Sequence, residues 1–199
     1  MEEELIGLQK LLIKASMETY SIKYRRELPS LMKRLGLPMV AAELGCAEGL
    51  NANDLLANGI DMLVMVDNWE KIEGITGDGN FDSEFHNSNY AQAMDRIEKY
   101  GSRVKVLRGL TTEMAIHIEN KVLGLVYVDA AHDYNSVKND ISAWFPKLVV
   151  GGIMAFHDHE NIAYGVKQAV KEFAEANGLK IFLIPEDRLD DAGAFFFKK

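Results

Sequence analysis

The sequence predicts an α/β fold: a three-layer sandwich on a seven-stranded, mostly parallel sheet, with an antiparallel C-terminal hairpin and an N-terminal helical cap. Short apolar runs alternate with segments of helical periodicity over most of the chain. Runs such as residues 63–66 and 125–128 are continuously apolar, which is typical of strands covered by helices on both faces. Residues 185–193 join the last two runs and are too few for a crossover helix, so these strands should pair antiparallel.

The N-terminal residues 3–35 carry apolar side chains at helical spacing and are followed by Gly36 and Pro38. This pattern predicts two helices. We expect residues 1–38 to form a helical cap on the substrate side. Residues 39–199 should form one compact domain, because the 199-residue chain is too short for two comfortable ones.

Strands and helices should alternate along the rest of the chain. Gly59, Gly101 and Gly178 stand where three of the helices are expected to end. Residues 68–89 show no clear period and are rich in Gly, Asp and Asn, which predicts a long loop that either binds a ligand or is mobile. Strands are expected over residues 39–44, 62–66, 104–107, 123–128, 152–156, 181–184 and 194–197, and helices over residues 51–58, 90–100, 111–118, 136–148 and 166–176.

Composition and charge narrow the function classes. The net charge of −8, without a basic block, disfavours DNA or RNA as a partner. Cys46 is the single cysteine, which excludes an intramolecular disulfide and fits a reducing compartment. The acidic N-terminus is unlike a signal peptide, and no run is long enough to span a membrane. We expect a cytoplasmic protein with a small-molecule substrate, and a homo-oligomer is compatible with the sequence.

The segment 42–49, Ala-Glu-Leu-Gly-Cys-Ala-Glu-Gly, joins the first predicted strand to the first helix after it, and Asp67 ends the next strand. Small residues let the backbone approach a ligand, and the helix start offers free N–H groups. An acid at the end of the second strand can accept hydrogen bonds from ribose hydroxyls. This arrangement predicts a nucleoside site, and an ordinary βα turn is the alternative interpretation.

The glycine spacing distinguishes between nucleosides. A dinucleotide turn, G-x-G-x-x-G, would need glycine where Leu50 stands, which disfavours an NAD-linked enzyme. The pattern E-x-G-x-G-x-G fits better, with Ala47 in the place of the middle glycine. It resembles motif I of the class I S-adenosyl-L-methionine (SAM) methyltransferases, which have a Rossmann-like fold.

That resemblance implies a set of cofactor-binding residues. The acid at Glu43 should lie near the methionine end of the cofactor, and Asp67 should bind the ribose. The extra methyl group of Ala47 should narrow the cofactor channel slightly. The full set implied is Glu43, Gly45, Ala47, Gly49, Asp67, Asn68, Gly109, Thr111 and Asp129.

Small or polar residues end each of the first five predicted strands. In an open α/β sheet, ligands bind beyond the carboxyl ends of the strands. The convergence of these side chains predicts a site there independently of any motif. The residues are Glu43 with Gly45, Asp67, Gly109, Asp129, and His157 with Asp158 and His159.

A second resemblance covers residues 39–158. The pattern D-x-x-H-x-Y begins at Asp129 after the fourth strand, and G-G-x-x-x-x-x-D begins at Gly151 and ends at Asp158. Both are similar to the methyltransferase domain 24 group.

Methyl transfer to a hydroxyl needs alignment of the two reactants and a way to remove the hydroxyl proton. His132 is the leading candidate base because imidazole titrates near neutral pH, and Asp129 is the second candidate catalytic residue. A histidine that only caps its loop is the alternative. Asp133 and Asp140 are more in keeping with structural roles, although either could orient His132.

Carboxylates at the ends of adjacent strands can also share a divalent cation. By resemblance to catechol-type and sugar O-methyltransferases, Asp129, Asp158 and His159 are the candidate metal ligands. The histidine, where the family usually has Asn or Asp, would favour Mn²⁺ or Zn²⁺ over Mg²⁺. A polar pocket floor without metal is the alternative. His157 and His159 should point to opposite sides of an extended strand, so both should not bind one metal.

Two weaker candidates, Thr111 and Trp69, each have two interpretations. Thr111 either lines an adenine pocket or caps a helix. Trp69 either stacks on the cofactor or covers the core, and Cys46 is expected to be a small buried residue.

The sequence therefore predicts a SAM-dependent O-methyltransferase of a small hydroxylated molecule, such as a sugar or natural product, with metal assistance left open. A small-molecule N-methyltransferase is the first alternative, although the usual Pro-Pro-aromatic segment is absent after Asp129. A non-catalytic SAM- or nucleotide-binding module is the second, and it would not need Asp129, His132 and Asp158. No segment encodes the substrate.

Overall fold

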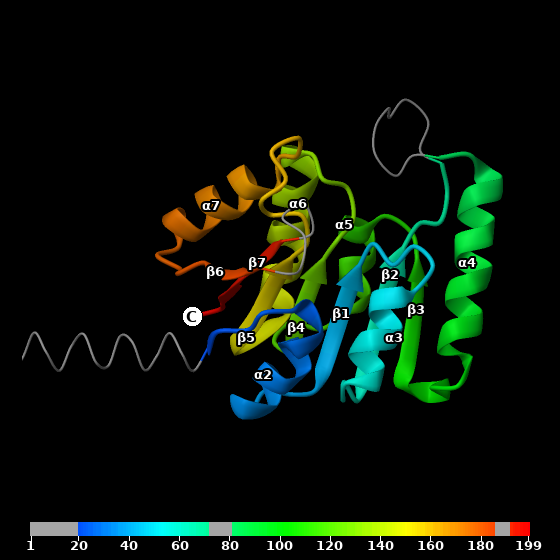
Figure 1. Ribbon diagram of the computed structural model, residues 1–199, viewed down its shortest axis with the longest axis horizontal. Helices are drawn as coiled ribbons and strands as arrows, with labels where there is room; N and C mark the ends of the chain where they lie inside the picture. Colours follow the sequence, from blue (N-terminus) through cyan, green and yellow to red (C-terminus); the bar gives the residue numbers. More distant parts are fainter. Residues whose placement is uncertain (1–19, 72–80, 186–191) are drawn as a thin grey trace, which may run out of the picture.

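Seven strands form the central sheet of the computed structural model, which describes residues 20–71, 81–185 and 192–199. Their order is β3-β2-β1-β4-β5-β7-β6 (Figure 1). The first five strands are parallel, and β7 runs antiparallel to both β5 and β6, as the sequence predicted. The strands are β1 Val40–Leu44, β2 Met62–Asp67, β3 Val104–Arg108, β4 Leu123–Val128, β5 Leu148–Phe156, β6 Phe182–Ile184 and β7 Gly193–Phe197.

Helices cover both faces of this sheet. Side chains from alternate strand positions enter two separate apolar clusters, as Leu125 and Val126 do on β4. This two-sided burial explains the continuously apolar strands. One face carries α2 Leu28–Arg34, α3 Leu50–Ala57 and α4 Ser83–Glu98, and the other carries α5 Thr111–Met114, α6 Tyr134–Trp144 and α7 Val166–Ala176. Short 3-10 turns cover Arg25–Glu27, Gly101–Arg103, Ala115–His117 and Phe145–Lys147.

The described part of the N-terminal segment packs into the core. Leu28, Leu31 and Met32 of α2 are fully buried in the same cluster as residues of β1, β4 and β5. A Cβ on Gly124 would lie 2.1 Å from the carbonyl oxygen of Pro38, so this segment approaches β4 closely. Residues 1–19, with the first predicted helix, lie outside the described residues, and the cap over the substrate side stays a prediction.

The predicted loop 68–89 is shorter than expected, because α4 begins at Ser83 and not at residue 90. Asp82 caps the helix by accepting a hydrogen bond from the N–H of Phe85 at 2.9 Å. The polar first turns of α4 hide the helical period in the sequence. Residues 72–80 of the predicted loop lie outside the described residues.

The helix predicted over 136–148 is also corrected. It runs from Tyr134 to Trp144 and passes into a 3-10 turn that contains Pro146, which has no N–H group to continue an α-helix. Strand β5 then begins at Leu148, four residues earlier than expected, with an irregular register against the start of β4. The other strand and helix boundaries agree with the prediction within one or two residues, apart from the short α5 and its 3-10 continuation.

Among the described residues, no helix is long and apolar enough to cross a membrane.

Candidate active site at the carboxyl edge of the sheet

The turn after β1 requires glycine. Gly45 and Gly49 have φ angles of +80° and +79°, in the left-handed region. A Cβ on Gly45 would lie 2.0 Å from the backbone oxygen of Asp129, so the ends of β1 and β4 touch without room for a side chain. Ala47, in the place of the middle glycine, also has a left-handed φ of 43°.

Asp67 holds this turn against the end of β2. Its Oδ2 accepts hydrogen bonds from the N–H groups of Cys46 and Ala47 at 2.8 and 2.9 Å, and its Oδ1 accepts one from Trp69 at 2.9 Å. A carboxylate accepts about four hydrogen bonds, which leaves capacity for a further donor such as a hydroxyl.

Trp69 and Cys46 are both structural. The Trp69 ring is 1% exposed, packs edge-on against Tyr90 and donates its indole N–H to the carbonyl oxygen of Ala47 at 2.8 Å. Trp69 therefore covers the core. Cys46 is a buried free thiol, and burial raises its pKa.

Glu43 lies beneath the turn and is 1% exposed. Its Oε1 accepts a hydrogen bond from the side-chain amide of Asn51 at 2.9 Å. Burial, opposed by the Asn51 hydrogen bond and assisted by the charges of Asp129 and Asp67, raises the pKa of Glu43 from 4.5 to about 8. Its side chain is therefore mainly a neutral acid at neutral pH.

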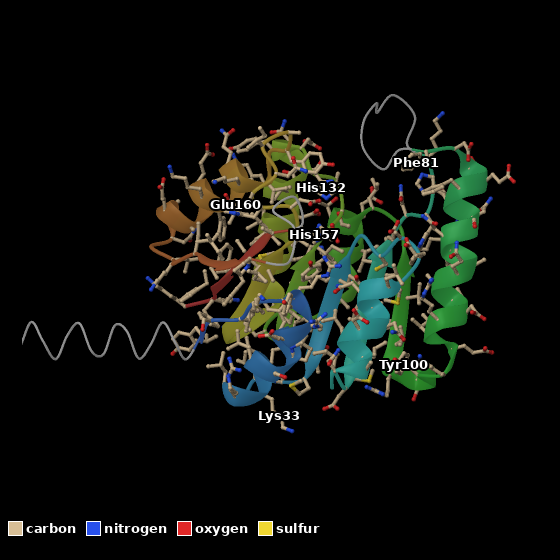
Figure 2. The ribbon with its side chains drawn as sticks, viewed as in Figure 1. Lys33, Phe81, Tyr100, His132, His157 and Glu160 are labelled. Carbon is tan, nitrogen blue, oxygen red and sulfur yellow. The ribbon has the colours of Figure 1, made fainter. Side chains whose placement is uncertain are left out.

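Two histidines and two carboxylates meet at the ends of β4 and β5, and Figure 2 shows His132 and His157 close together there. His132 Nε2 lies 3.1 Å from Asp158 Oδ2 and 3.4 Å from Asp129 Oδ1. His157 Nδ1 lies 3.1 and 3.5 Å from the same two oxygens. The ring of Tyr164 stacks on His132 with centroids 4.5 Å apart. Three of the predicted site residues, Asp129, His132 and Asp158, are thus brought together.

Arg25 and His157 also belong to this cluster, although neither of them was assigned a catalytic or binding role from the sequence. Arg25 Nη1 lies 2.6 Å from His157 Nε2. Because a guanidinium only donates, Nε2 must accept, which places the proton of a neutral ring on Nδ1, facing the carboxylates. Burial disfavours the charged ring, but the contact with Asp158 and the charge of Asp129 outweigh burial and Arg25 and raise the pKa of His157.

The structure does not bring His159 into this cluster. Its side chain is 4% exposed, and Nδ1 contacts Glu160 Oε1 at 2.8 Å. His157 and His159 contact different carboxylates, although not as neighbours on an extended strand, because β5 ends at Phe156 and Asp158 has a left-handed φ of 52°. His132 stands in the place of His159, because one ligand atom from each of Asp129, His132 and Asp158 lies within 4.8 Å of the others.

Asp133 and Asp140 have structural contacts. Asp133 caps α6 by accepting hydrogen bonds from the N–H groups of Asn135 and Ser136. Asp140 is buried and accepts a hydrogen bond from the Thr111 hydroxyl at 2.5 Å. Burial, opposed by this hydrogen bond, raises the pKa of Asp140 to about 6. Thr111 therefore ties α5 to α6, and the cap position of α5 belongs to Leu110.

A pocket of about 410 Å³ lies at the ends of β2 and β3, beside the Asp67 turn. Asn68 and Gly109, two residues of the predicted cofactor set, line it, whereas Thr111 does not. The other lining residues are Glu70, Lys71, Arg108, Leu110 and Glu113. A second hollow of about 470 Å³ lies between α4 and the start of β3, away from the carboxyl edge.

Comparison with known proteins gives one family. A family model described as a methyltransferase domain matches residues 42–159, which is more than half of the chain. An uncharacterized protein, y4gI, of Sinorhizobium fredii (strain NBRC 101917 / NGR234) is 34% identical over 87 residues, or 43% of this chain. The matched part spans only 10% of the length of that protein.

Solved structures share the fold at low identity. An O-methyltransferase from Bacillus cereus, in complex with S-adenosylhomocysteine (SAH), has a TM-score of 0.63 and 14% identity, covering 100% of this chain and 92% of its own. The O-methyltransferase TomG from Streptomyces achromogenes, involved in tomaymycin synthesis and in complex with SAM, has a TM-score of 0.62 and 15% identity. The match covers 88% of this chain and 79% of TomG. A TDP-rhamnose 3'-O-methyltransferase of calicheamicin biosynthesis has a TM-score of 0.56 and 18% identity. The match covers 86% of this chain and 78% of that enzyme.

Proposed function

This chain belongs to the methyltransferase domain family, and from that membership we propose that it is a SAM-dependent methyltransferase that O-methylates a small hydroxylated molecule, such as a sugar or natural product. The single observation that carries the proposal is the position of Asp129 between the glycine turn and His132. Its backbone packs on Gly45 of the glycine turn, and its carboxylate faces His132. A cofactor site and a candidate base are therefore adjacent.

The residues of the turn fit SAM. The backbone at Gly45 has no room for a Cβ, the Asp67 carboxylate suits hydroxyl donors, and the buried Glu43 suits a cation. Asn68 and Gly109 line the neighbouring pocket, where an adenine ring would lie. When bound, SAM supplies a methyl group on a sulfonium that is open to in-line displacement.

His132 is proposed to take the proton of the attacking hydroxyl. Its Nε2 is held 3.1 Å from Asp158, and Tyr164 stacks on the ring. The carboxylates of Asp129 and Asp158 would stabilise the imidazolium that forms. A neutral amine can attack without first losing a proton, so this base favours O- over N-methylation. The similar folds that act on TDP-rhamnose and in tomaymycin synthesis support sugars and natural products as the substrate class.

The test is an assay for SAH formed from SAM with a panel of hydroxylated sugars and phenols. His132→Asn should lower turnover by about a hundredfold to ten-thousandfold, because a positioned base contributes that much. SAH binding by the variant should be unchanged. The exposed His117→Asn is the matched control and should keep full activity. An H132N variant that turns over like H117N would contradict the role of base.

The second candidate is a divalent cation held by Asp129, His132 and Asp158. It is favoured because one possible ligand atom from each of these residues lies within 4.8 Å of the others. Two carboxylates and one imidazole suit Mn²⁺ or Zn²⁺ better than Mg²⁺. In that arrangement His132 would be a ligand, and the cation would lower the pKa of the substrate hydroxyl. Activity that a chelator abolishes and Mn²⁺ restores would favour the metal, and activity that a chelator leaves intact would favour the base.

A further inference from the structure

Three carboxyl groups surround the end of β1. Glu43 pairs in register with residues of β2 and β4 that lie two positions before Asp67 and Asp129. Side chains alternate along a strand, so all three carboxyl groups leave the same face of the sheet. Between Asp67 and Asp129, the corresponding position on β1 is Gly45, which has no side chain. Glu43 therefore forms the floor between two acids.

The three carboxyl groups differ in their partners. Asp67 accepts three backbone N–H groups, and Asp129 faces two histidines. Glu43 uses Oε1 for Asn51, while its Oε2 is buried and has no hydrogen-bond partner among the described residues. A buried polar oxygen without a partner costs folding free energy, so its retention points to a ligand that completes it.

Burial, more than the surrounding charges, keeps Glu43 neutral. Burial raises its pKa to about 8, the Asn51 amide and the Cys46 thiol lower it, and the charges of Asp129 and Asp67 raise it further. A cation in this space would reverse the balance, because it stabilises a carboxylate beside it. SAM carries a sulfonium and an ammonium group, and SAH carries the ammonium group.

We propose that Glu43 is protonated in the free protein and releases this proton to solvent when a small organic cation binds beside its free carboxyl oxygen. The inference rests on the proposed function only for the identity of that cation, the ammonium or sulfonium group of the cofactor. Binding and proton release are then one linked equilibrium. Cofactor affinity should increase with pH, by up to tenfold per pH unit, and level off above about pH 8.

The test is calorimetric titration with SAH at about pH 7, in two buffers of different ionisation enthalpy, which gives the number of protons exchanged. The wild-type chain should release close to one proton per SAH bound, and Glu43→Gln should release none. The exposed Glu119→Gln is the matched control and should behave like wild type. SAH binding without proton release, or equal release by E43Q, would overturn the inference while leaving the proposed function intact.

Infrared spectroscopy of the free protein makes the test independent of binding. At about pH 7 the wild-type chain should show the carbonyl band of a protonated carboxylic acid, and E43Q should lack it. The Asp140→Asn variant removes any contribution to this band from Asp140, the other buried acid, whose pKa is about 6. A wild-type spectrum without the band overturns the inference. If SAH gave no heat at all, the proposed function would fail, and this band would still decide the protonation of Glu43.

Discussion

Unusual backbone conformations gather at single residues of the candidate site. Ala47, Trp69 and Asp158 have φ angles of 43°, 46° and 52°, and they are three of the four non-glycine residues with positive φ in the described part of the chain. Each such conformation costs about 1–3 kcal/mol and needs surrounding contacts to hold it. Asp67 provides such contacts for Ala47 and Trp69. The backbone at the carboxyl edge of the sheet therefore lowers the folding free energy gained there, and it holds the site residues in one defined arrangement.

Glu43 should make stability depend on pH. Its pKa in the folded protein is about 8, against an ordinary value of 4.5. Between these values the folded chain keeps a proton that the unfolded chain has lost, so this contribution to the free energy of unfolding decreases as pH rises. Glu43→Gln should therefore be more stable than wild type above about pH 8, by an amount on the order of a few kcal/mol, with a smaller difference below pH 4.5.

Urea unfolding of E43Q, wild type and Glu119→Gln at several pH values measures this effect. The control should follow wild type throughout. A difference between E43Q and wild type that does not change with pH would contradict a raised pKa for Glu43.

At the scale of elements, the strands were predictable because burial on both faces leaves a continuously apolar run, as in β2 and β4. The start of α4 was not, because its first turns are polar and only the cap at Asp82 marks its beginning. The end of α6 was missed because apolar side chains continue through the 3-10 turn into β5. Periodicity locates elements that bury a face and fails where a cap or proline sets the boundary.

The Asp82 cap should be measurable. Asp82→Ala leaves the N–H of Phe85 without its acceptor and should lower the free energy of unfolding by about 1 kcal/mol. Asp82→Asn keeps an acceptor oxygen and should cost much less, because Asn and Asp are about equally favourable at this position. Chemical denaturation compares the two. Equal stability of D82A and D82N would show that the side-chain bond does not stabilise α4.

The candidate site was predictable only where its residues follow the ends of paired strands. Asp129, His132 and Asp158 follow two strands whose ends had to meet, so their convergence could be read from the sequence. Arg25 could not be placed, because its contact with His157 joins residues 132 positions apart and no strand pairing positions the segment before β1. His159 was misjudged because the chain after β5 turns at Asp158, which has a left-handed φ.

At the scale of the whole molecule, residues 20–38 pack into the same core as the sheet. Leu28, Leu31 and Met32 are fully buried, and Arg25 reaches the histidine cluster. Each large buried side chain removed from a core costs about 2–5 kcal/mol. Their sum is comparable with the roughly 5–15 kcal/mol that stabilises a typical domain.

Deleting residues 1–38 should therefore prevent cooperative folding. Circular dichroism during heating would show a broad transition or none. The point substitution Leu31→Ala should keep the fold at reduced stability and serves as the graded control. A truncated chain with the same melting temperature as wild type would show that residues 39–199 fold independently.

The most direct measurement of the central claim is calorimetric titration of the chain with SAH, compared with Asp67→Ala. The account predicts saturable binding to one site in the wild-type chain. Loss of the charged acceptor for ribose hydroxyls should weaken binding by about tenfold to a hundredfold in D67A, which a thermal melt must show to be folded. Absence of binding by the folded wild-type chain, or unchanged affinity in D67A, would contradict a cofactor site built on the glycine turn and Asp67.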